Sequence, residues 1–438
     1  MHKEIMMKQE TRTLNMIEKG KPLAIQGWKA PFFTIWLGQA FSLLGSQLVG
    51  FALVWYMTEL TGSAKVLATA AMMEWLPRVF VGPIAGTIAD RWNRKRVMLL
   101  ADSFTALATG GLIYLGWSGE LQIWHIYLLM MARSIGGAFH FPAMTASTTL
   151  MVPEEHLSRV QGLNQLLQGV MNIAAPPLGA LLVEILPLHR VLSVDIGTAV
   201  LAVFSLLLIQ IPQPKADADS KLKESSIWDG LRAGFLYVWH WSGLKKIILL
   251  AVLINAISVP AFTLLPLLVT KEFGGAAIEI ATMQSAFAIG FLVGGLLLAV
   301  WGGFRRKIIT AVLGIFGSAA GMLLVGTAPS SVFTLAVSGI FLAGFMSVMT
   351  NGPTFALLQT VVEETMQGRV MSLIVSLANA FTPLGLLISG PLAEVNGIRS
   401  WFVLTSIVFA LAGIFVLRSE DVKNIETSGK SNQLLTAN

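Results

Sequence analysis

The stretch GTIADRWNRKRVMLL, residues 86 to 100, sets five charged residues between two long apolar runs. Apolar runs of about 20 residues, each long enough to cross a hydrocarbon layer roughly 30 Å thick, recur along the whole chain. Over 438 residues the composition is 55% hydrophobic and 12% charged, with a mean hydropathy of +0.71. Soluble domains contain roughly 25% charged residues, so a soluble core could not bury this much apolar surface. The sequence therefore predicts an all-α protein that crosses the lipid bilayer many times.

The apolar runs and the polar segments between them predict twelve transmembrane helices in two sets of six. We expect a cytoplasmic N-terminal segment (1–31), a first six-helix bundle (32–211), a cytoplasmic linker (212–245), a second six-helix bundle (246–418) and a cytoplasmic tail (419–438). In the linker, Ser226 and Asp229 resemble a capping box, and the helix that they start would lie on the inner membrane surface or simply connect the bundles. The twelve spans are expected at 32–57, 66–89, 97–117, 124–149, 160–185, 190–211, 246–269, 278–301, 306–327, 331–358, 367–394 and 400–418.

The basic residues predict the orientation of the chain in the membrane. If both termini lie in the cytoplasm, the cytoplasmic segments contain 24 of the 30 Lys and Arg residues and the external loops contain four. Cytoplasmic loops carry an excess of Lys and Arg, so this bias indicates a multi-pass protein of the inner (plasma) membrane with both ends inside. Topology and contact with anionic lipids also account for the pI of about 9.5, so we expect no nucleic-acid partner.

The two halves of the chain repeat each other. A shift of 210 residues places Glu154 on Glu364, and it also places Glu184 on Glu394. Parallel repeats of this kind pack about an axis along the membrane normal and rock around a central cavity. The chain contains no cysteine, and its six His residues show no repeated ligand spacing, so we expect no cofactor and no metal site.

The quoted stretch resembles the signature of the major facilitator superfamily, G-x-x-x-D-R/K-x-G-R-R/K, which lies between the second and third helices of that family. The resemblance extends over essentially the whole chain and implies the fold of that family, two pseudo-symmetric six-helix bundles. Asn93 stands where the signature has Gly, a tolerable departure because Asn is the next residue able to enter a left-handed turn. In the second half Trp301 replaces the acid, so only the first half should use the carboxylate. The matching residues are Gly86, Asp90, Arg91, Arg94, Lys95 and Arg96.

Asp90 is expected at the C-terminal end of the second helix, where the helix dipole disfavours a negative charge. It therefore needs a positive partner, and the family resemblance favours the start of a second-half helix near Gly368 and Arg369. A bond of this kind would join the halves at the inner face in one state and break in the other, as a conformational latch. The alternative is a structural clamp within the loop, whose cations Arg94, Lys95 and Arg96 keep it on the cytoplasmic side.

Arg133 is expected inside the fourth span, where a charge that faced lipid would cost roughly 3 kcal/mol or more. It must therefore face the protein interior. Arg133 and Gly137 resemble the family motif R-x-x-Q-G, with Gly136 where Gln is usual, and the resemblance implies a part in proton coupling. The alternative is a structural Arg that neighbouring carbonyl groups satisfy. We interpret His140, two turns further along, as a packing residue.

The segment APPLGA, residues 175 to 180, resembles the drug-antiporter signature G-P-x-x-G-G, with Pro176, Pro177 and Gly179 as the relevant residues. Small residues let two helices approach closely and Pro bends a helix, so this segment would form an interface that can rock. Ordinary helix packing explains the segment nearly as well.

Glu74 and Arg78 stand four residues apart in the second span, on one helix face, and can pair. Both must face protein or a wet cavity, because each alone costs roughly 3 kcal/mol in mid-membrane. Either the two charges only neutralise each other, or Glu74 alternately binds a proton and a cationic compound. Asp102 and Asp195 are expected to orient their helices rather than bind substrate.

These features predict a secondary active exporter that exchanges a bulky, mostly apolar small molecule for protons. GPIAGTIADRWNRKR, ARSIGGAFHFPA and DGLRAGFLYV are similar to bacterial macrolide-efflux-like proteins, a branch that also resembles siderophore and lysophospholipid transporters. Uptake by symport is a further alternative, and a membrane sensor is the alternative outside transport. The sequence contains no H-E-x-x-H, G-x-S-x-G or G-x-x-x-x-G-K-[ST] motif, so we expect neither an enzyme nor an ATP-driven pump. We expect the protein to act as a monomer.

Overall fold

The computed structural model describes residues 27–213 and 235–426, without the side chains of Thr87, Asp90, Arg91, Glu364 and Thr365. The described residues form long helices and no strand. Ten helical segments are long and apolar enough to cross a membrane. The other two long helices are α3 and α5, which contain Glu74, Arg78 and Arg133. The first six helices are α2 (Lys29–Thr61), α3 (Ala64–Arg91), α4 (Arg94–Ser118), α5 (Ile123–Met151), α6 (Glu154–Ile185) and α7 (Leu188–Leu208).

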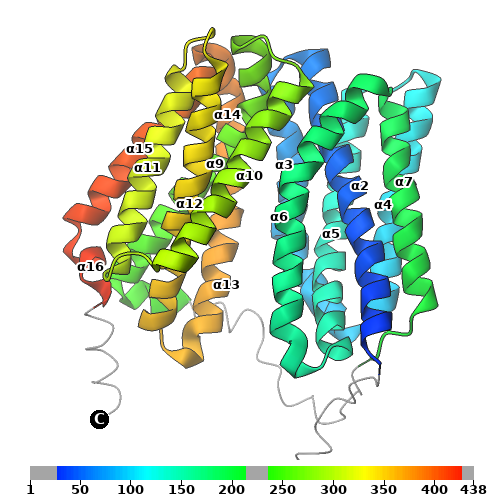
Figure 1. The fold of residues 1–438 in the computed structure, drawn as a ribbon, viewed down its shortest axis with the longest axis horizontal. Helices are drawn as coiled ribbons and strands as arrows, with labels where there is room; N and C mark the ends of the chain where they lie inside the picture. Colours follow the sequence, from blue (N-terminus) through cyan, green and yellow to red (C-terminus); the bar gives the residue numbers. More distant parts are fainter. Residues whose placement is uncertain (1–26, 214–234, 427–438) are drawn as a thin grey trace, which may run out of the picture.

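The second half repeats this order of helices. Its long helices are α9 (Ser242–Glu272), α10 (Ala277–Trp301), α11 (Lys307–Thr327), α12 (Phe333–Val361), α13 (Glu364–Ala380) continued by α14 (Thr382–Asn396), and α15 (Ile398–Arg418). Corresponding ends keep a nearly constant offset: α2 ends at Thr61 and α9 at Glu272, and α7 ends at Leu208 and α15 at Arg418. Figure 1 shows the halves as two bundles side by side, with α4 and α7 at one outer edge and α11 and α15 at the other.

The expected span at 367–394 is divided into two helices. α13 ends at Ala380 and α14 begins at Thr382, with Pro383 in its first turn. Proline has no N–H, and its ring collides with the carbonyl of the residue four positions earlier, so a helix breaks or kinks there. In the first half Pro176 and Pro177 lie inside α6, and that helix continues through them.

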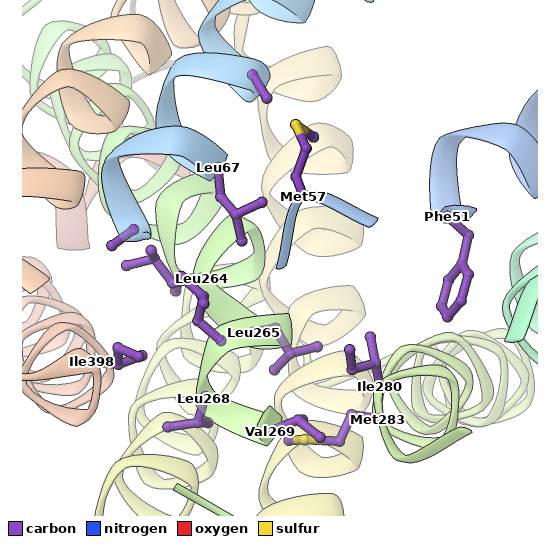
Figure 2. Packing of buried hydrophobic residues seen from close by; sticks show 14 of the residues in the cluster. Phe51, Met57, Leu67, Leu264, Leu265, Leu268, Val269, Ile280, Met283 and Ile398 are labelled. Atoms are coloured by element: carbon purple, nitrogen blue, oxygen red, sulfur yellow. The ribbon is translucent and has the colours of Figure 1, made fainter. Parts of the chain in front are cut away.

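One apolar cluster runs through both bundles at the end of the molecule opposite to the start of α2 and the end of α15. It includes Met57 and Leu67 from the first bundle and Leu264, Leu265 and Ile280 from the second, all nearly inaccessible to solvent. Figure 2 shows Met57 and Leu67 above the second-half residues Leu264 and Leu265. The described residues of the two bundles therefore share a core at this end.

At the other end, where α2 begins and α15 ends, the cores of the two bundles are separate. One cluster, which includes Phe32, Met98 and Val160, contains first-half residues alone, and another, which includes Leu244 and Val370, contains second-half residues alone. Figure 1 shows α6 and α13 apart at this lower end, while the upper ends of the bundles lie close together. The bundles are thus packed at one end of the molecule and separated at the other.

The short helix α16 (Glu420–Lys423) returns to the second bundle after α15. Asp421 lies 2.5 Å from the Lys246 ammonium and accepts a hydrogen bond of 2.8 Å from the Ser242 hydroxyl. The hydrogen bond from Lys246 lowers the pKa of the Asp421 carboxyl. Val422 and Ile425 are fully buried, so this segment closes the base of the second bundle.

Candidate functional site

The boundary between the bundles is the candidate site, because it contains the ionisable and helix-interface residues that the sequence analysis selects on α3 and α6. At the packed end, the beginning of α3 lies against the end of α14. Glu394 accepts hydrogen bonds from the Ser63 hydroxyl (2.7 Å) and the Lys65 amide (3.3 Å), and its Oε2 lies 2.6 Å from the Lys65 ammonium. The carboxylate therefore sits beside the positive N-terminal end of α3, where the helix dipole favours it.

Gly390 permits this close approach of α14 to α3. A Cβ atom at position 390 would lie 3.0 Å from the Cα of Lys65 and 3.2 Å from the Cβ of Ala68. The sequence analysis aligns Glu394 with Glu184 in the repeat, but it does not join Glu394 to Lys65. No local sequence pattern connects residues that far apart.

A second contact between the bundles involves the proline segment of α6. Pro177 has no N–H, so the carbonyl of Ile173 loses its usual helical donor. The hydroxyl of Ser285 on α10 donates a hydrogen bond of 2.9 Å to that carbonyl. Gly179 lies against α2, where a Cβ atom would come within 2.9 Å of the Phe51 ring. The segment that contains Pro176, Pro177 and Gly179 thus makes contacts both within the first bundle and across the boundary.

The signature loop lies at the separated end. Asn93 does not use the left-handed turn that Asn can enter: its φ is −64° and its ψ is 110°, and no described residue other than glycine has a positive φ. Asn93 is instead the N-cap of α4, and its side chain accepts a hydrogen bond of 3.1 Å from the Arg96 amide. N-cap residues adopt extended backbone angles, and Asn is among the best caps, so capping and not turn geometry explains this residue.

Two loop cations bind the ends of neighbouring helices. Arg94 donates to the Ala146 carbonyl of α5 (2.8 Å), and the Lys95 ammonium donates to the carbonyls of Leu207 (3.1 Å) and Ile209 (2.9 Å) at the end of α7. The carbonyls of Leu207 and Ile209 lie at the C-terminus of α7 and lack a helical donor, and the Lys95 ammonium satisfies them. Besides any role in topology, these side chains therefore hold the base of the first bundle together.

Asp90, for which a latch role is predicted, lies in the last turn of α3, but its side chain and that of Arg91 lie outside the described part of the structure. Gly86 is one turn earlier, and a Cβ atom there would meet no atom within 4 Å. Among the described atoms α3 is therefore uncovered at Gly86, in contrast to α14 at Gly390.

Arg133 faces the interior of the first bundle. Its Nη1 lies 2.5 Å from Oδ2 of Asp195 on α7, and its Nη2 donates to the carbonyl of Ser46 on α2 (3.1 Å). The side chains of Arg133 and Asp195 are only 15% and 4% exposed. The hydroxyls of Ser46 and Thr109 also donate to Asp195, at 3.3 and 3.2 Å. Sequence reasoning found both charged residues but did not pair them.

A second polar group lies nearer to the termini in the same bundle. Oδ1 of Asp102 on α4 is 3.5 Å from Nε2 of His140 on α5, and Oδ2 accepts a hydrogen bond of 3.3 Å from Gln39 on α2. Asp102 and His140 are 12% and 21% exposed. The sequence analysis treats each of these residues separately.

Glu74 and Arg78 form the ion pair that their spacing allows, with 2.6 Å between Oε1 and Nη2. The side chains are 40% and 50% exposed, so the protein itself covers them only in part. The Arg78 guanidinium also lies 5.6 Å from the centre of the Trp75 ring, and Ser134 of α5 donates to the Glu74 carbonyl. Among the described residues no group of three or more His, Cys, Asp or Glu could hold a metal ion.

Comparison with known protein families identifies one matching family. A model for a family described as "Transmembrane secretion effector" matches residues 22–436. Macrolide efflux protein A of Streptococcus pyogenes is 32% identical over 399 residues, which cover 91% of this chain and 98% of that protein. Multidrug efflux pump Tap of Mycobacterium tuberculosis is 24% identical over 417 residues, which cover 92% of this chain and 97% of that protein.

Solved structures with the same arrangement of helices are transporters. A mutant of the nucleoside transporter NupG matches with a TM-score of 0.69 at 15% identity, over 89% of this chain and 99% of that one. A bacterial homologue of the human lysosomal transporter Spinster, in an inward-facing and unoccupied conformation, matches with a TM-score of 0.68 at 14% identity, over 93% of this chain and 98% of that one. At these identities the likeness shows a common fold.

Proposed function

Because this chain belongs to the transmembrane secretion effector family of the major facilitator superfamily, we propose that it exports bulky, mostly apolar compounds such as macrolides in exchange for protons. Membership of this family confirms the resemblance read from the signature loop, and it makes the protein a multi-pass membrane transporter and not an enzyme. The observation that carries the proposed substrate class is the 32% identity to Macrolide efflux protein A over nearly the full length of both chains.

The proposed mechanism is alternating access. The bundles share a core at one end and are separate at the other, which is the geometry of a transporter open toward one side. With both termini in the cytoplasm, as the distribution of Lys and Arg favours, this state is open to the cytoplasm and ready to receive an export substrate. Closing the cytoplasmic end would bring the open face of α3, around Gly86, against the second bundle.

Asp90 is proposed as the latch of that closed cytoplasmic end. Its position in the last turn of α3 and the open surface beside Gly86 support a partner from the opposite bundle, near Gly368 and Arg369. The loop cations Arg94 and Lys95 bind carbonyls of their own bundle. Proton coupling is proposed because ionisable side chains, Arg133 among them, are buried inside the first bundle.

Accumulation of a radiolabelled macrolide tests this function. Macrolide-sensitive bacterial cells with and without the gene are loaded with the compound, and the measurement is repeated with a protonophore. We expect expression to lower accumulation and the protonophore to abolish the difference. Equal accumulation across a broad panel of amphiphilic compounds would refute export, and export that persists with the protonophore would refute only the coupling.

A further inference from the structure

Polar side chains in the core of the first bundle form two layers. The first layer is the group around Arg133 and Asp195, and the second is the group around Asp102 and His140. On each of three helices the residues of the two layers are seven positions apart: Gln39 and Ser46 on α2, Asp102 and Thr109 on α4, and His140 and Arg133 on α5. Seven residues span about 10.5 Å along a helix. The layers are therefore stacked, two turns apart, inside one bundle.

The two layers differ in how their charge responds to pH. Arginine stays protonated in proteins, so Arg133 and an ionised Asp195 balance each other at any physiological pH. Histidine gains and loses its proton near neutral pH. With a neutral His140 and an ionised Asp102 the second layer carries one negative charge, and with one added proton it carries none. The second layer thus changes its charge by one when a proton binds.

The contacts of His140 suit such a change. Nε2 of His140 is buried and makes no hydrogen bond among the described residues, although it lies only 3.5 Å from Asp102. A proton on Nε2 would make this nitrogen a hydrogen-bond donor to the Asp102 carboxylate. Gln39 holds the other oxygen of Asp102, which keeps the carboxylate in place as an acceptor.

The surrounding charged groups are already paired. From α7, Asp195 faces this region and is bound to Arg133. From α3, Glu74 and Arg78 pair with each other. On α2 no acidic or basic side chain occurs between Lys29 and Glu59, so that helix contributes only Gln39 at this level. The nearest basic residues on α4 are Arg94 and Lys95, which donate to backbone carbonyls, and Arg96.

We propose that Asp102 and His140 together form the binding site for the transported proton, and that Arg133 and Asp195 form a fixed charge pair beside it. This inference rests on the proposed proton-coupled export and names the site of coupling. Nε2 of His140 takes a proton from water, the imidazolium pairs with Asp102, and the same proton later returns to water on the other side. A single unbalanced charge is costly inside the membrane, so sealing the layer from water costs more without the bound proton than with it.

Reconstituted vesicles test this site with radiolabelled erythromycin, a macrolide, as the probe. Two transport modes are compared: accumulation driven by a pH gradient, and exchange of labelled for unlabelled erythromycin without a gradient. We expect His140→Gln and Asp102→Asn to lose gradient-driven accumulation and to keep exchange, with the pH dependence of the exchange rate also lost. His156→Gln is the matched control, because this imidazole also lies beside a carboxylate, 3.4 Å from Glu155, but outside the two layers. The control should behave as the wild type.

His140→Arg provides a second, independent variant. It replaces the titratable cation with a permanent one and gives the second layer the charge balance of the first, so it decides the question if His140→Gln is not recovered from membranes. It should exchange erythromycin and fail to accumulate it against a gradient.

Gradient-driven accumulation at the wild-type level in either His140 variant would overturn the proton site and leave the proposed function intact. An equal loss of exchange and accumulation in both variants would show a structural pair and would also overturn the site. If the wild-type protein exchanges erythromycin but a pH gradient does not drive it, the proposed coupling itself fails.

Discussion

Ser285 of the second bundle and Ile173 of the first are joined by a hydrogen bond of 2.9 Å that a proline makes available. Pro177 removes the helical donor of the Ile173 carbonyl, and the Ser285 hydroxyl takes its place. A bend in one helix is thus combined with a bond to the opposite bundle, at the end where the two bundles share their core. This contact stabilises the observed state and must break when that end opens.

Ser285→Ala should therefore shift the protein away from this state. One hydrogen bond contributes about 1 kcal/mol net, which is roughly a five-fold change in an equilibrium. Pro177→Ala should act in the same direction, because α6 would then satisfy the Ile173 carbonyl itself.

The chain has no cysteine, so a single Gly82→Cys on α3, one turn before Gly86, can report the state through its rate of maleimide labelling. We expect slower labelling in both variants. Ser338→Ala, whose hydroxyl bonds within its own helix, is the control, and unchanged labelling in Ser285→Ala would contradict the role of the bond.

Ala68→Cys combined with Gly390→Cys should lock the packed end. A Cβ atom at position 390 would lie 3.2 Å from that of Ala68, close to the roughly 3.8 Å of a disulfide. Oxidation should stop transport, and dithiothreitol should restore it. Each single-cysteine variant under oxidant is the control. The side chains of Lys65 and Glu394 nearby are 59% and 31% exposed, so their ion pair contributes no more than about 1 kcal/mol. Lys65→Met should therefore change the transport rate far less than the cross-link does. Full transport by a completely cross-linked protein would show that this end does not open.

Asp90→Asn should leave the protein inserted in the membrane but strongly slow transport. The loop cations and their carbonyl contacts remain, while the proposed bond to the second bundle loses its charge. Arg96→Gln is a control from the same loop, with its backbone contact to Asn93 retained. Membrane abundance and initial export rate are the two measurements. Transport at the wild-type rate in Asp90→Asn would refute the proposed latch.

Arg133 and Asp195 should show strong coupling in a double-mutant cycle. Removal of one partner of a buried ion pair leaves an uncompensated charge and costs about 3–5 kcal/mol. Arg133→Met and Asp195→Asn should each lower the thermal midpoint in detergent, and the double variant should recover part of the loss. Strictly additive losses would mean that the two residues act on stability separately.

Glu74→Gln distinguishes the two roles left open for the pair on α3. If Glu74 binds protons or cations, this variant should remain folded but lose export of cationic compounds or its pH dependence. If the pair is structural, membrane abundance should fall and the double variant Glu74→Gln with Arg78→Gln should restore it. The partial exposure of both side chains favours the functional role. Wild-type membrane abundance, transport rate and pH profile in the double variant would refute the functional role of Glu74.

The seven-residue spacing of the two polar layers is visible in the sequence, but its meaning is not. Gln39, Ser46, Asp102 and Thr109 are single polar residues in apolar helices, and such residues often serve only to join neighbouring helices. Their common level becomes apparent once α2, α4 and α5 are placed side by side. The break before Pro383 and the capping role of Asn93 depend instead on local backbone geometry, which the motif resemblance does not describe.

Sequence alone determined which segments cross the membrane, because in lipid each helix must satisfy its own backbone hydrogen bonds and present an apolar surface. Both requirements are local, so length and hydropathy find ten helical segments among the described residues, and only α3 and α5, which contain Glu74, Arg78 and Arg133, fall short. Tertiary structure decided which charges meet: Arg133 with Asp195, and Lys65 with Glu394, which are 62 and 329 residues apart along the chain. Such pairs depend on how separate helices pack and rotate against one another, and no property of either residue's own neighbours in the sequence specifies that.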